Sequence, residues 1–303
     1  MVKNKLYHGN NLEVLKTLKD ESIDLIYLDP PFFSKRKREA IWNGDVRTFD
    51  DGCAGGIDLY ITWLRERVTE MYRVLKPTGS IYVHCDWHAN SYIRVEVLDK
   101  IFGSTNFRNE IMWVRATNTG SFKAIAKKFP NNIDSIFYYT KSSKYCFNRI
   151  TKGYKKEYLR KFNLEDDHGK YKWQPLKSCS EETYDKLDRE GKIKNNTTSK
   201  YPQYKKYLHE LQDGVPLSNL WNDIPPIGPM SKERVGYPTQ KPEALLQRII
   251  EVSSNEGDVV LDPCCGSGTT LVVADKLNRK WIGIDQSEQA LEITRSRMKQ
   301  IKK

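Results

Sequence analysis

The chain has 303 residues, of which 38% are hydrophobic and 29% are charged, a composition typical of a soluble globular protein and unlike a disordered one. No apolar run reaches the roughly 18–20 residues of a membrane-spanning helix, and the first residues lack the apolar core of a signal peptide. We therefore expect a cytoplasmic protein without a membrane partner. The six cysteines follow no disulfide or metal-ligand spacing, which favours reduced thiols and no metal site.

The net charge of +11 is concentrated in one part of the chain. Residues 141–212 contain 18 Lys and Arg, 10 Asp and Glu, and eight of the 17 tyrosines. Basic residues interleaved with aromatic ones suit contacts with phosphates and stacking on bases. A solvated basic surface is the alternative, so charge favours a nucleic-acid partner without establishing one.

In chain order, predicted strands and helices alternate in the first part of the chain and again in the last part, with an interruption between them. Apolar patterns predict strands at 5–10, 23–28, 80–86, 109–115 and 133–140, with helices after residue 10, over 58–76 and over 89–102. Residues 34–57 are expected to form a long loop. The pattern fades over 141–228 and returns with a helix after Pro242, strands at 258–261 and 281–284, and helices after each. This order is typical of a doubly wound, mostly parallel α/β sheet, and it divides the chain into 1–140, an inserted region 141–228, and 229–303.

The tetrapeptide Asp29-Pro30-Pro31-Phe32 ends the apolar run at 23–28. Proline lacks an N–H and has a fixed φ, so this turn is stiff and leaves carbonyl groups free to accept hydrogen bonds. Acceptors beside the flat face of Phe32 suit a planar group with an exocyclic amine, such as adenine or cytosine. A strand end with a core Phe is the alternative reading of the tetrapeptide alone. The next basic run, Lys35, Arg36, Lys37 and Arg38, is expected to grip a nucleic-acid backbone.

A second motif joins the strand at 258–261 to a helix through Asp262-Pro263-Cys264-Cys265-Gly266-Ser267-Gly268-Thr269-Thr270. Glycines let a ligand approach the backbone, and the helix N-terminus offers free N–H donors. Asp285 ends the next strand, at the position from which an acid binds ribose hydroxyls in Rossmann-type units. The run is not a phosphate loop, which favours S-adenosylmethionine over NAD as the ligand.

Two other chemistries fit these residues less well. Pro263-Cys264 could be a cytosine-C5 nucleophile or part of a zinc deaminase site, but it lies inside the glycine turn, and Ser267 replaces the second deaminase cysteine. His84, Asp86 and His88 could bind a metal from one face of a strand, but no fourth ligand is evident. We expect the cysteines to line the cofactor pocket and these polar residues to border the active cleft.

Together the motifs resemble those of the amino-methylating DNA methyltransferases, in the permuted group called beta. That group has a DPPY/F tetrapeptide near the N-terminus, a target recognition region, and the cofactor glycine turn near the C-terminus. The tetrapeptide, the basic insert, the segment 237–242 and the run 262–270 follow in that order here. The resemblance covers roughly 5–140 and 217–298. The leading Asp29 and the segment 220–224 resemble the adenine-N6 members, since cytosine-N4 members more often begin with Ser.

The resemblance implies a Rossmann-like methyltransferase fold with circularly permuted motif order. It also implies methyl transfer from S-adenosylmethionine to adenine N6 of a flipped base in double-stranded DNA. Cytosine N4 as acceptor and a non-catalytic DNA-binding protein on the same scaffold are the alternatives. The implied partners are duplex DNA, a cognate restriction endonuclease and a second copy of the chain.

The resemblance also assigns roles to single residues. Asp29 and the Pro30 carbonyl would accept hydrogen bonds from the target amino group, Phe32 would stack on the base, and Pro31 completes the catalytic motif. Thr239 and Lys241 would close over the amino-acid end of the cofactor. The implied cofactor-binding residues are Asn10, Asp29, Thr239, Lys241, Asp262, Pro263, Cys264, Gly266, Ser267, Gly268, Thr269 and Asp285. The family often has an acid where Asn10 stands and Phe where Cys264 stands.

Overall fold

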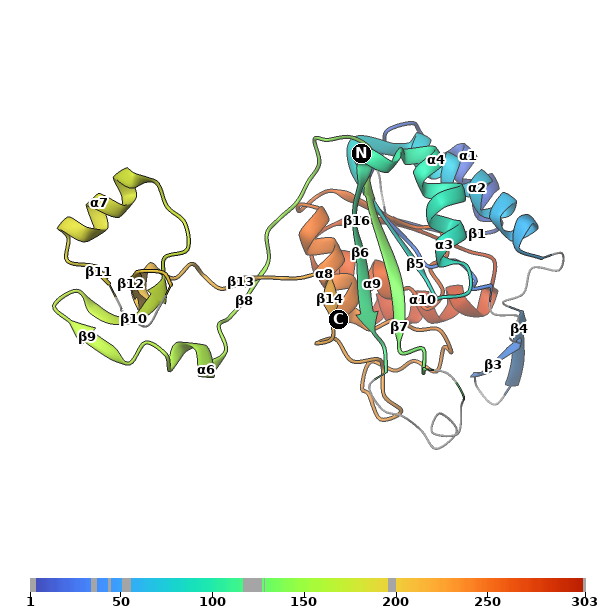
Figure 1. The fold of residues 1–303 in the computed structure, drawn as a ribbon. Coiled ribbons are helices and arrows are strands. Elements are labelled where there is room, and N and C mark those ends of the chain that lie inside the picture. Colours follow the sequence, from blue (N-terminus) through green and yellow to red (C-terminus); the bar gives the residue numbers. More distant parts are fainter. Residues whose placement is uncertain are drawn as a thin grey trace. The chain divides into compact units, whose positions relative to one another are not determined.

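The computed structural model describes residues 4–33, 37–42, 45–50, 56–116, 127, 129–195 and 200–301, with only the backbone described for 37–42 and 45–50. The chain folds into two compact units (Figure 1). The main unit comprises Met1–Asn148 and Ser218–Lys303, and the second unit comprises Arg149–Leu217. Each unit is described by itself.

An eight-stranded sheet forms the centre of the main unit, in the order β1-β16-β15-β2-β5-β7-β6-β14. The first five strands run parallel, β7 is antiparallel to both of its neighbours, and β14 is parallel to β6. The predicted doubly wound, mostly parallel sheet is confirmed. Its strands are β1 (Lys5–His8), β2 (Ile23–Leu28), β5 (Leu75–Cys85), β6 (Phe107–Val114), β7 (Ile133–Thr140), β14 (Leu220–Trp221), β15 (Val259–Asp262) and β16 (Lys280–Asp285).

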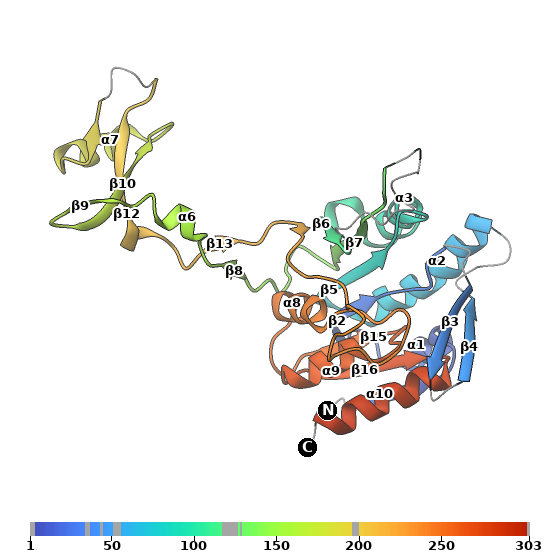
Figure 2. The same cartoon turned by 90° about the horizontal axis from the view of Figure 1, so that it is seen from below.

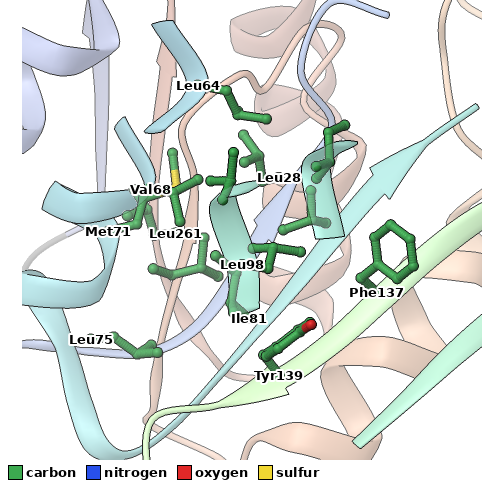
Figure 3. Close-up of a cluster of buried hydrophobic side chains, with 14 of the residues drawn as sticks. Leu28, Leu64, Val68, Met71, Leu75, Ile81, Leu98, Phe137, Tyr139 and Leu261 are labelled. Atoms are coloured by element: carbon green, nitrogen blue, oxygen red, sulfur yellow. The ribbon is translucent and has the colours of Figure 1, made fainter. Parts of the chain in front are cut away.

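Helices cover both faces of this sheet, because alternate strand residues point to opposite faces. On one face, Ile26 and Leu28 of β2 belong to an apolar cluster with Leu64, Val68 and Met71 of α2, part of which Figure 3 shows. On the other face, residues of β2 and β15 pack against α8, α9 and α10. The helical segments are α1 (Asn11–Thr17), α2 (Gly56–Val74), α3 (Asn90–Tyr92), the π-helical η1 (Ile93–Leu98), α4 (Asp99–Phe102), the 3₁₀ turn η2 (Ser104–Asn106), α8 (Glu243–Ser253), α9 (Thr269–Lys276) and α10 (Glu288–Ile301).

Two predicted elements of the main unit were wrong in part. The expected loop at 34–57 contains an antiparallel pair, β3 (Lys37–Trp42) and β4 (Asp45–Asp50), seen in Figure 2. The sequence between these strands is Asn-Gly, a common hairpin signal. The expected helix at 89–102 is divided, because a π-helical segment separates α3 from α4.

The second unit is built around a small four-stranded sheet in the order β11-β12-β10-β9. Its bounds differ from those predicted for the insert, 141–228, because Leu220–Trp221 pairs with β6 and so belongs to the main sheet. The elements are β8 (Thr151–Lys152), α6 (Lys156–Leu159), β9 (Leu164–Asp166), β10 (Gly169–Pro175), α7 (Glu181–Arg189), β11 (Ile193–Lys194), β12 (Gln203–Tyr207), η3 (Leu208–Glu210) and β13 (Val215–Pro216). In the described part of the chain, no helix combines the length and apolar character needed to cross a bilayer.

Candidate functional site

The main sheet has a topological switch point between β2 and β15. The chain leaves β2 towards α2 on one face and leaves β15 for α9 on the other. In open α/β sheets, the carboxyl ends of such neighbouring strands diverge into a crevice that binds ligands. A cavity of about 630 Å³ opens at this point of the sheet edge.

Most of the predicted site residues line this cavity. The sheet brings together the tetrapeptide after β2, the glycine turn after β15 and the segment before α8. The tetrapeptide and the glycine turn are more than 200 residues apart in the sequence. Asn10 and Gly268 are not part of its wall. The predicted residues that line it are Asp29, Pro30, Pro31, Phe32, Thr239, Lys241, Asp262, Pro263, Cys264, Gly266, Ser267, Thr269 and Asp285.

The two carboxylate oxygens of Asp29 have different surroundings. Oδ2 accepts a hydrogen bond from Lys241 Nζ, which also lies 5.4 Å from the centroid of the Phe32 ring. Oδ1 is buried and has no hydrogen-bond partner among the described residues. A buried polar atom left unpaired costs about 1–3 kcal/mol, so an orphan acceptor on a cavity wall points to a ligand that donates to it. The role of Lys241 at the cofactor stays a prediction, since its ammonium group lies on Asp29.

Beneath Asp29, the fully buried His84 of β5 connects three strands. Its Nδ1 lies 2.8 Å from the hydroxyl of Tyr27 on β2 and 4.0 Å from Asp29 Oδ1. Its Nε2 lies 3.4 Å from Oδ2 of Asp134 on β7. Oδ1 of Asp134 accepts a hydrogen bond from Nε of Arg115 at 2.7 Å. Sequence reasoning missed this network, because its members are adjacent only in the folded sheet.

The other polar residues near the end of β5 do border the cavity. Asp86 and His88 line it and interact with each other at 2.7 Å, whereas His84 is buried behind Phe32, with ring centroids 5.7 Å apart. Among the residues described, no group of three or more His, Cys, Asp or Glu side chains is arranged to hold a metal ion.

Asp262 organises the glycine turn from the end of β15. Its carboxylate accepts hydrogen bonds from the Cys264 backbone N–H at 3.1 Å and from Thr270 Oγ1 at 2.5 Å. Burial, with a contribution from neighbouring carboxylates, raises the pKa of Asp262 to about 7. Burial also raises the pKa of the Cys264 and Cys265 thiols well above the usual range, so both stay protonated at neutral pH, unlike a nucleophilic cysteine.

The raised pKa of Asp262 predicts a stability contribution that is lost as pH rises. The folded chain binds this proton more tightly than the unfolded chain does, so the contribution is full below about pH 4 and disappears as pH passes through 7. A shift from 3.8 to about 7 corresponds to at most about 4 kcal/mol. Asp262→Asn is neutral at every pH, so its free energy of unfolding should fall less between pH 5 and 8 than that of the wild type. Urea unfolding at stepped pH measures both slopes, and equal slopes would contradict the prediction.

Asp285 is held in place at the end of β16. Its carboxylate accepts hydrogen bonds from the backbone N–H groups of Gly266 and Ser287, both at 2.8 Å. Each carboxylate oxygen can accept more than one hydrogen bond, so capacity remains for ribose hydroxyls. A Cβ on Gly266 would stand 3.1 Å from the ring of Tyr237. The Tyr237 ring therefore packs closely on the turn, and glycine is the residue that fits best at position 266. These residues fit the nucleoside part of S-adenosylmethionine.

Gly268 helps to shape the turn without lining the cavity. Its φ is +73°, and a Cβ there would stand 2.6 Å from the side chain of the fully buried Thr294. Gly257 has a similar φ of +83° but open space around its Cβ position. Gly268→Ala should therefore lower the free energy of unfolding by about 2–4 kcal/mol, and the control Gly257→Ala by about 1 kcal/mol. Urea titration of the two variants tests this prediction. Equal losses of unfolding free energy would mean that the positive φ alone, and not the contact with Thr294, causes the destabilisation.

Asn11, which the sequence analysis did not select, lines the cavity next to the turn. Its Nδ2 donates to the Pro263 carbonyl at 3.1 Å, while its Oδ1 accepts from Nε of the buried Arg67 at 2.7 Å. Arg67 thereby fixes the amide so that its N–H groups face the turn. Asn10 is exposed and caps α1 by accepting from the Leu12 backbone N–H at 3.0 Å. Two adjacent asparagines at a helix start gave no signal of which would face the cavity.

The predicted DNA-binding residues are described only in part. Lys35 and Arg36 lie outside the described residues, and Lys37 and Arg38 begin β3 with their backbone alone described. In the second unit, the aromatic rings contact each other and lysines. For example, Lys172 Nζ lies 4.2 Å from the centroid of the Tyr158 ring. This unit contains 16 Lys and Arg against 11 Asp and Glu, so a positive excess remains.

Comparison with known proteins places the chain in a family. Residues 23–296 match the N6_N4_Mtase family, described as DNA methylase. The chain is 32% identical over 293 residues to the type II methyltransferase M.EcaI of Enterobacter cloacae, covering 87% of this chain and 62% of that one. It is 33% identical over 296 residues to the type II methyltransferase M.BamHI of Bacillus amyloliquefaciens, covering 97% of this chain and 57% of that one. The chain thus spans roughly three-fifths of the length of these two relatives.

Shorter relatives and solved structures agree with this match. DNA adenine methyltransferase YhdJ of Escherichia coli K12 is 29% identical over 289 residues, covering 95% of this chain and 80% of that one. The structure of PvuII DNA methyltransferase (cytosine-N4-specific) has the same fold, with a TM-score of 0.59, 16% identity, and coverage of 98% and 86% of the two chains. The family match over residues 23–296, most of the chain, shows that this chain belongs to the DNA methylase family.

Proposed function

We propose that this protein transfers the methyl group of S-adenosylmethionine to an exocyclic amino group of a flipped base in duplex DNA, with adenine N6 as the acceptor. The observation that carries the proposal is Asp29 Oδ1, a buried acceptor without a partner among the described residues, in one cavity with the glycine turn. An amino group has the N–H donors that such an acceptor lacks.

The side chains around Asp29 suit the orientation of an amine. Hydrogen bonds from the amino group to Asp29 Oδ1 and to the Pro30 carbonyl would direct its nitrogen lone pair away from these acceptors. Phe32 would hold the base plane by stacking, and Lys241 offsets the carboxylate charge from its other side. Bound S-adenosylmethionine would supply a methyl group on a positively charged sulfur. Catalysis by the chain is then mainly positioning and electrostatic stabilisation.

The cofactor part of the proposal depends on the turn and on Asp285. The covered backbone at Gly266 and the fixed carboxylate of Asp285 fit an adenosine group without phosphate. The fold of a Thermus thermophilus protein solved with S-adenosyl-L-methionine is similar, with a TM-score of 0.56 at 19% identity, covering 98% of this chain and 93% of that one.

Adenine N6 and cytosine N4 are both exocyclic amines that need the same acceptors, so geometry favours neither. The Asp at position 29 and the adenine methyltransferase YhdJ among the relatives support adenine. Cytosine N4 is the second candidate, since a cytosine-N4-specific enzyme shares the fold. The relatives named type II methyltransferases support a place in a restriction-modification system, with a cognate endonuclease as a partner. A homodimer is part of the same proposal.

The test is to incubate the purified protein with unmethylated genomic DNA and S-adenosylmethionine and to sequence the product by a method that detects modified bases. N6-methyladenine at one short recurring motif is the expected result. N4-methylcytosine would keep the mechanism and change the base. The absence of any modified base, with tight DNA and cofactor binding retained, would favour a binding protein on this scaffold.

A further inference from the structure

The acceptor on which the proposed function rests lies near His84, which is itself hydrogen-bonded to Tyr27. His84 Nδ1 lies 4.0 Å from Asp29 Oδ1, and the Tyr27 hydroxyl lies 2.8 Å from the same Nδ1. At 4.0 Å the His84 nitrogen makes no hydrogen bond to this oxygen, but an N–H directed at the oxygen would compete electrostatically with the substrate amine. Since Tyr27 and His84 are both buried, solvent does not compete for these hydrogens.

The position of the proton on His84 decides where both hydrogens point. A neutral imidazole has one N–H donor and one acceptor nitrogen. With the proton on Nε2, Nδ1 accepts the Tyr27 O–H, and neither group donates towards Asp29. With the proton on Nδ1, the N–H faces Tyr27 and Asp29, and the Tyr27 O–H is released from His84. Only the Nε2–H tautomer leaves Asp29 Oδ1 free.

Asp134 lies where it can select that tautomer. Its Oδ2 is 3.4 Å from His84 Nε2, a charge contact without hydrogen-bond geometry, and this nitrogen has no hydrogen-bond partner among the described residues. An unprotonated Nε2 would place its lone pair against the carboxylate, so Asp134 favours a proton there.

Arg115 reduces the extent to which Asp134 stabilises a second proton on the His84 ring. Its Nε donates to Asp134 Oδ1 at 2.7 Å. Burial raises the pKa of Asp134, but the contacts with His84 and Arg115 outweigh it, so the pKa lies below the usual value and the carboxylate is ionised at neutral pH. A carboxylate already paired with a guanidinium stabilises a doubly protonated imidazolium less than a bare one does.

We propose that Asp134 and Arg115 hold His84 in the neutral Nε2–H tautomer, which makes His84 a positioning residue that keeps Asp29 Oδ1 free for the substrate amine. His84 touches no reacting atom and transfers no proton in this role. The alternative is that His84 only fills space between Phe32 and Trp113, whose rings each lie 5.7 Å from its own. A space-filling ring would be indifferent to its tautomer.

Nitrogen-15 spectra of the histidine rings test the proposal directly. The chain has five histidines, so the full-length protein should give five ring systems, assigned by replacing the other four with Gln one at a time: His8, His88, His168 and His209. The wild type should show His84 as Nε2–H at pH 7.5. Asp134→Asn can donate its amide N–H to Nε2, and this should move His84 towards Nδ1–H. The single-turnover methylation rate should fall about tenfold, with cofactor and DNA dissociation constants within about twofold.

A second variant and a matched control accompany Asp134→Asn. Arg115→Gln changes a side chain that is 40% exposed, so this substitution is less of a risk to folding. It should increase the imidazolium form of His84 and lower the methylation rate, as Asp134→Asn does. Asp99→Asn is the control, because Asp99 also accepts from a tyrosine hydroxyl, that of Tyr139 at 2.6 Å, but lies outside the cavity. It should change neither the His84 spectrum nor the rate.

Three results would overturn the proposal: an Nδ1–H or doubly protonated His84 in the wild type, a tautomer change without a rate change, or a rate change without any change in the ring spectrum. A wild-type protein that methylates no DNA would instead refute the proposed function, while the ring spectra would still decide the tautomer.

Discussion

Asp29→Ala should lower the single-turnover methylation rate by about a thousandfold or more, because it removes the acceptor proposed to orient the amine and the charge proposed to stabilise the amine in the transition state. The hydrogen bonds that hold the glycine turn and Asp285, the proposed cofactor site, do not involve this side chain. Cofactor and duplex dissociation constants should therefore change by no more than about threefold, which is about 0.7 kcal/mol. Transfer of labelled methyl groups to the DNA, with calorimetry for both ligands, measures these quantities.

Stability must be separated from chemistry in this experiment. Asp29 and Lys241 are mostly buried, with side-chain exposures of 16% and 12%, and breaking such a pair costs about 3–5 kcal/mol. Asp29→Ala combined with Lys241→Met should regain much of the stability and none of the activity. Asp24→Ala is the matched control, because Asp24 lies on the same strand and pairs with Lys76 at 2.7 Å outside the cavity. Normal methylation by Asp29→Ala would remove Asp29 from the mechanism.

The elements that the sequence predicted well are those with local signals. The strand at 23–28 and the glycine turn are encoded by consecutive residues: an apolar run, then a turn that few sequences can make. Their meeting in one cavity follows from a general rule, since the carboxyl ends of parallel strands share an edge of the sheet. The tetrapeptide and the turn could therefore be assigned to one site from the sequence alone.

The contacts that the sequence did not predict depend on packing between distant segments. Arg67 reaches Asn11 across 56 residues, and His84 reaches Asp134 across 50, and neither pair has a spacing that marks it. The two-residue strand Leu220–Trp221 is likewise too short to have a pattern of its own, and it exists as a strand because β6 supplies its partner. For this reason the compact second unit ends at Leu217, whereas the insert predicted from the sequence extends to residue 228.

Excision of the second unit should strongly weaken duplex binding and leave the main unit folded. The two ends of this unit lie side by side, because β8 pairs with β13 and the Leu217 N–H donates to the Ile150 carbonyl at 3.3 Å. A short Gly-Ser linker from Asn148 to Ser218 can therefore replace it. Among the residues that the structure describes, neither the main sheet nor the cavity lining includes one from the second unit, so cofactor affinity should stay within about twofold and the thermal midpoint within a few degrees.

Duplex affinity should fall about a hundredfold or more at 0.1 M salt, because the unit carries an excess of five positive charges that can neutralise phosphates. The wild type should bind DNA with a steep salt dependence, and the excised protein with a much shallower one, since fewer counterions are released. Fluorescence titration of a labelled duplex across a salt series measures both slopes. Tight and salt-dependent binding by the excised protein would place the DNA-binding surface on the main unit, where the basic run at 35–38 follows the tetrapeptide 29–32 after two intervening residues. In that case the second unit would contribute the choice of sequence and little of the affinity, because phosphate contacts position a protein on DNA whereas base contacts specify where it binds.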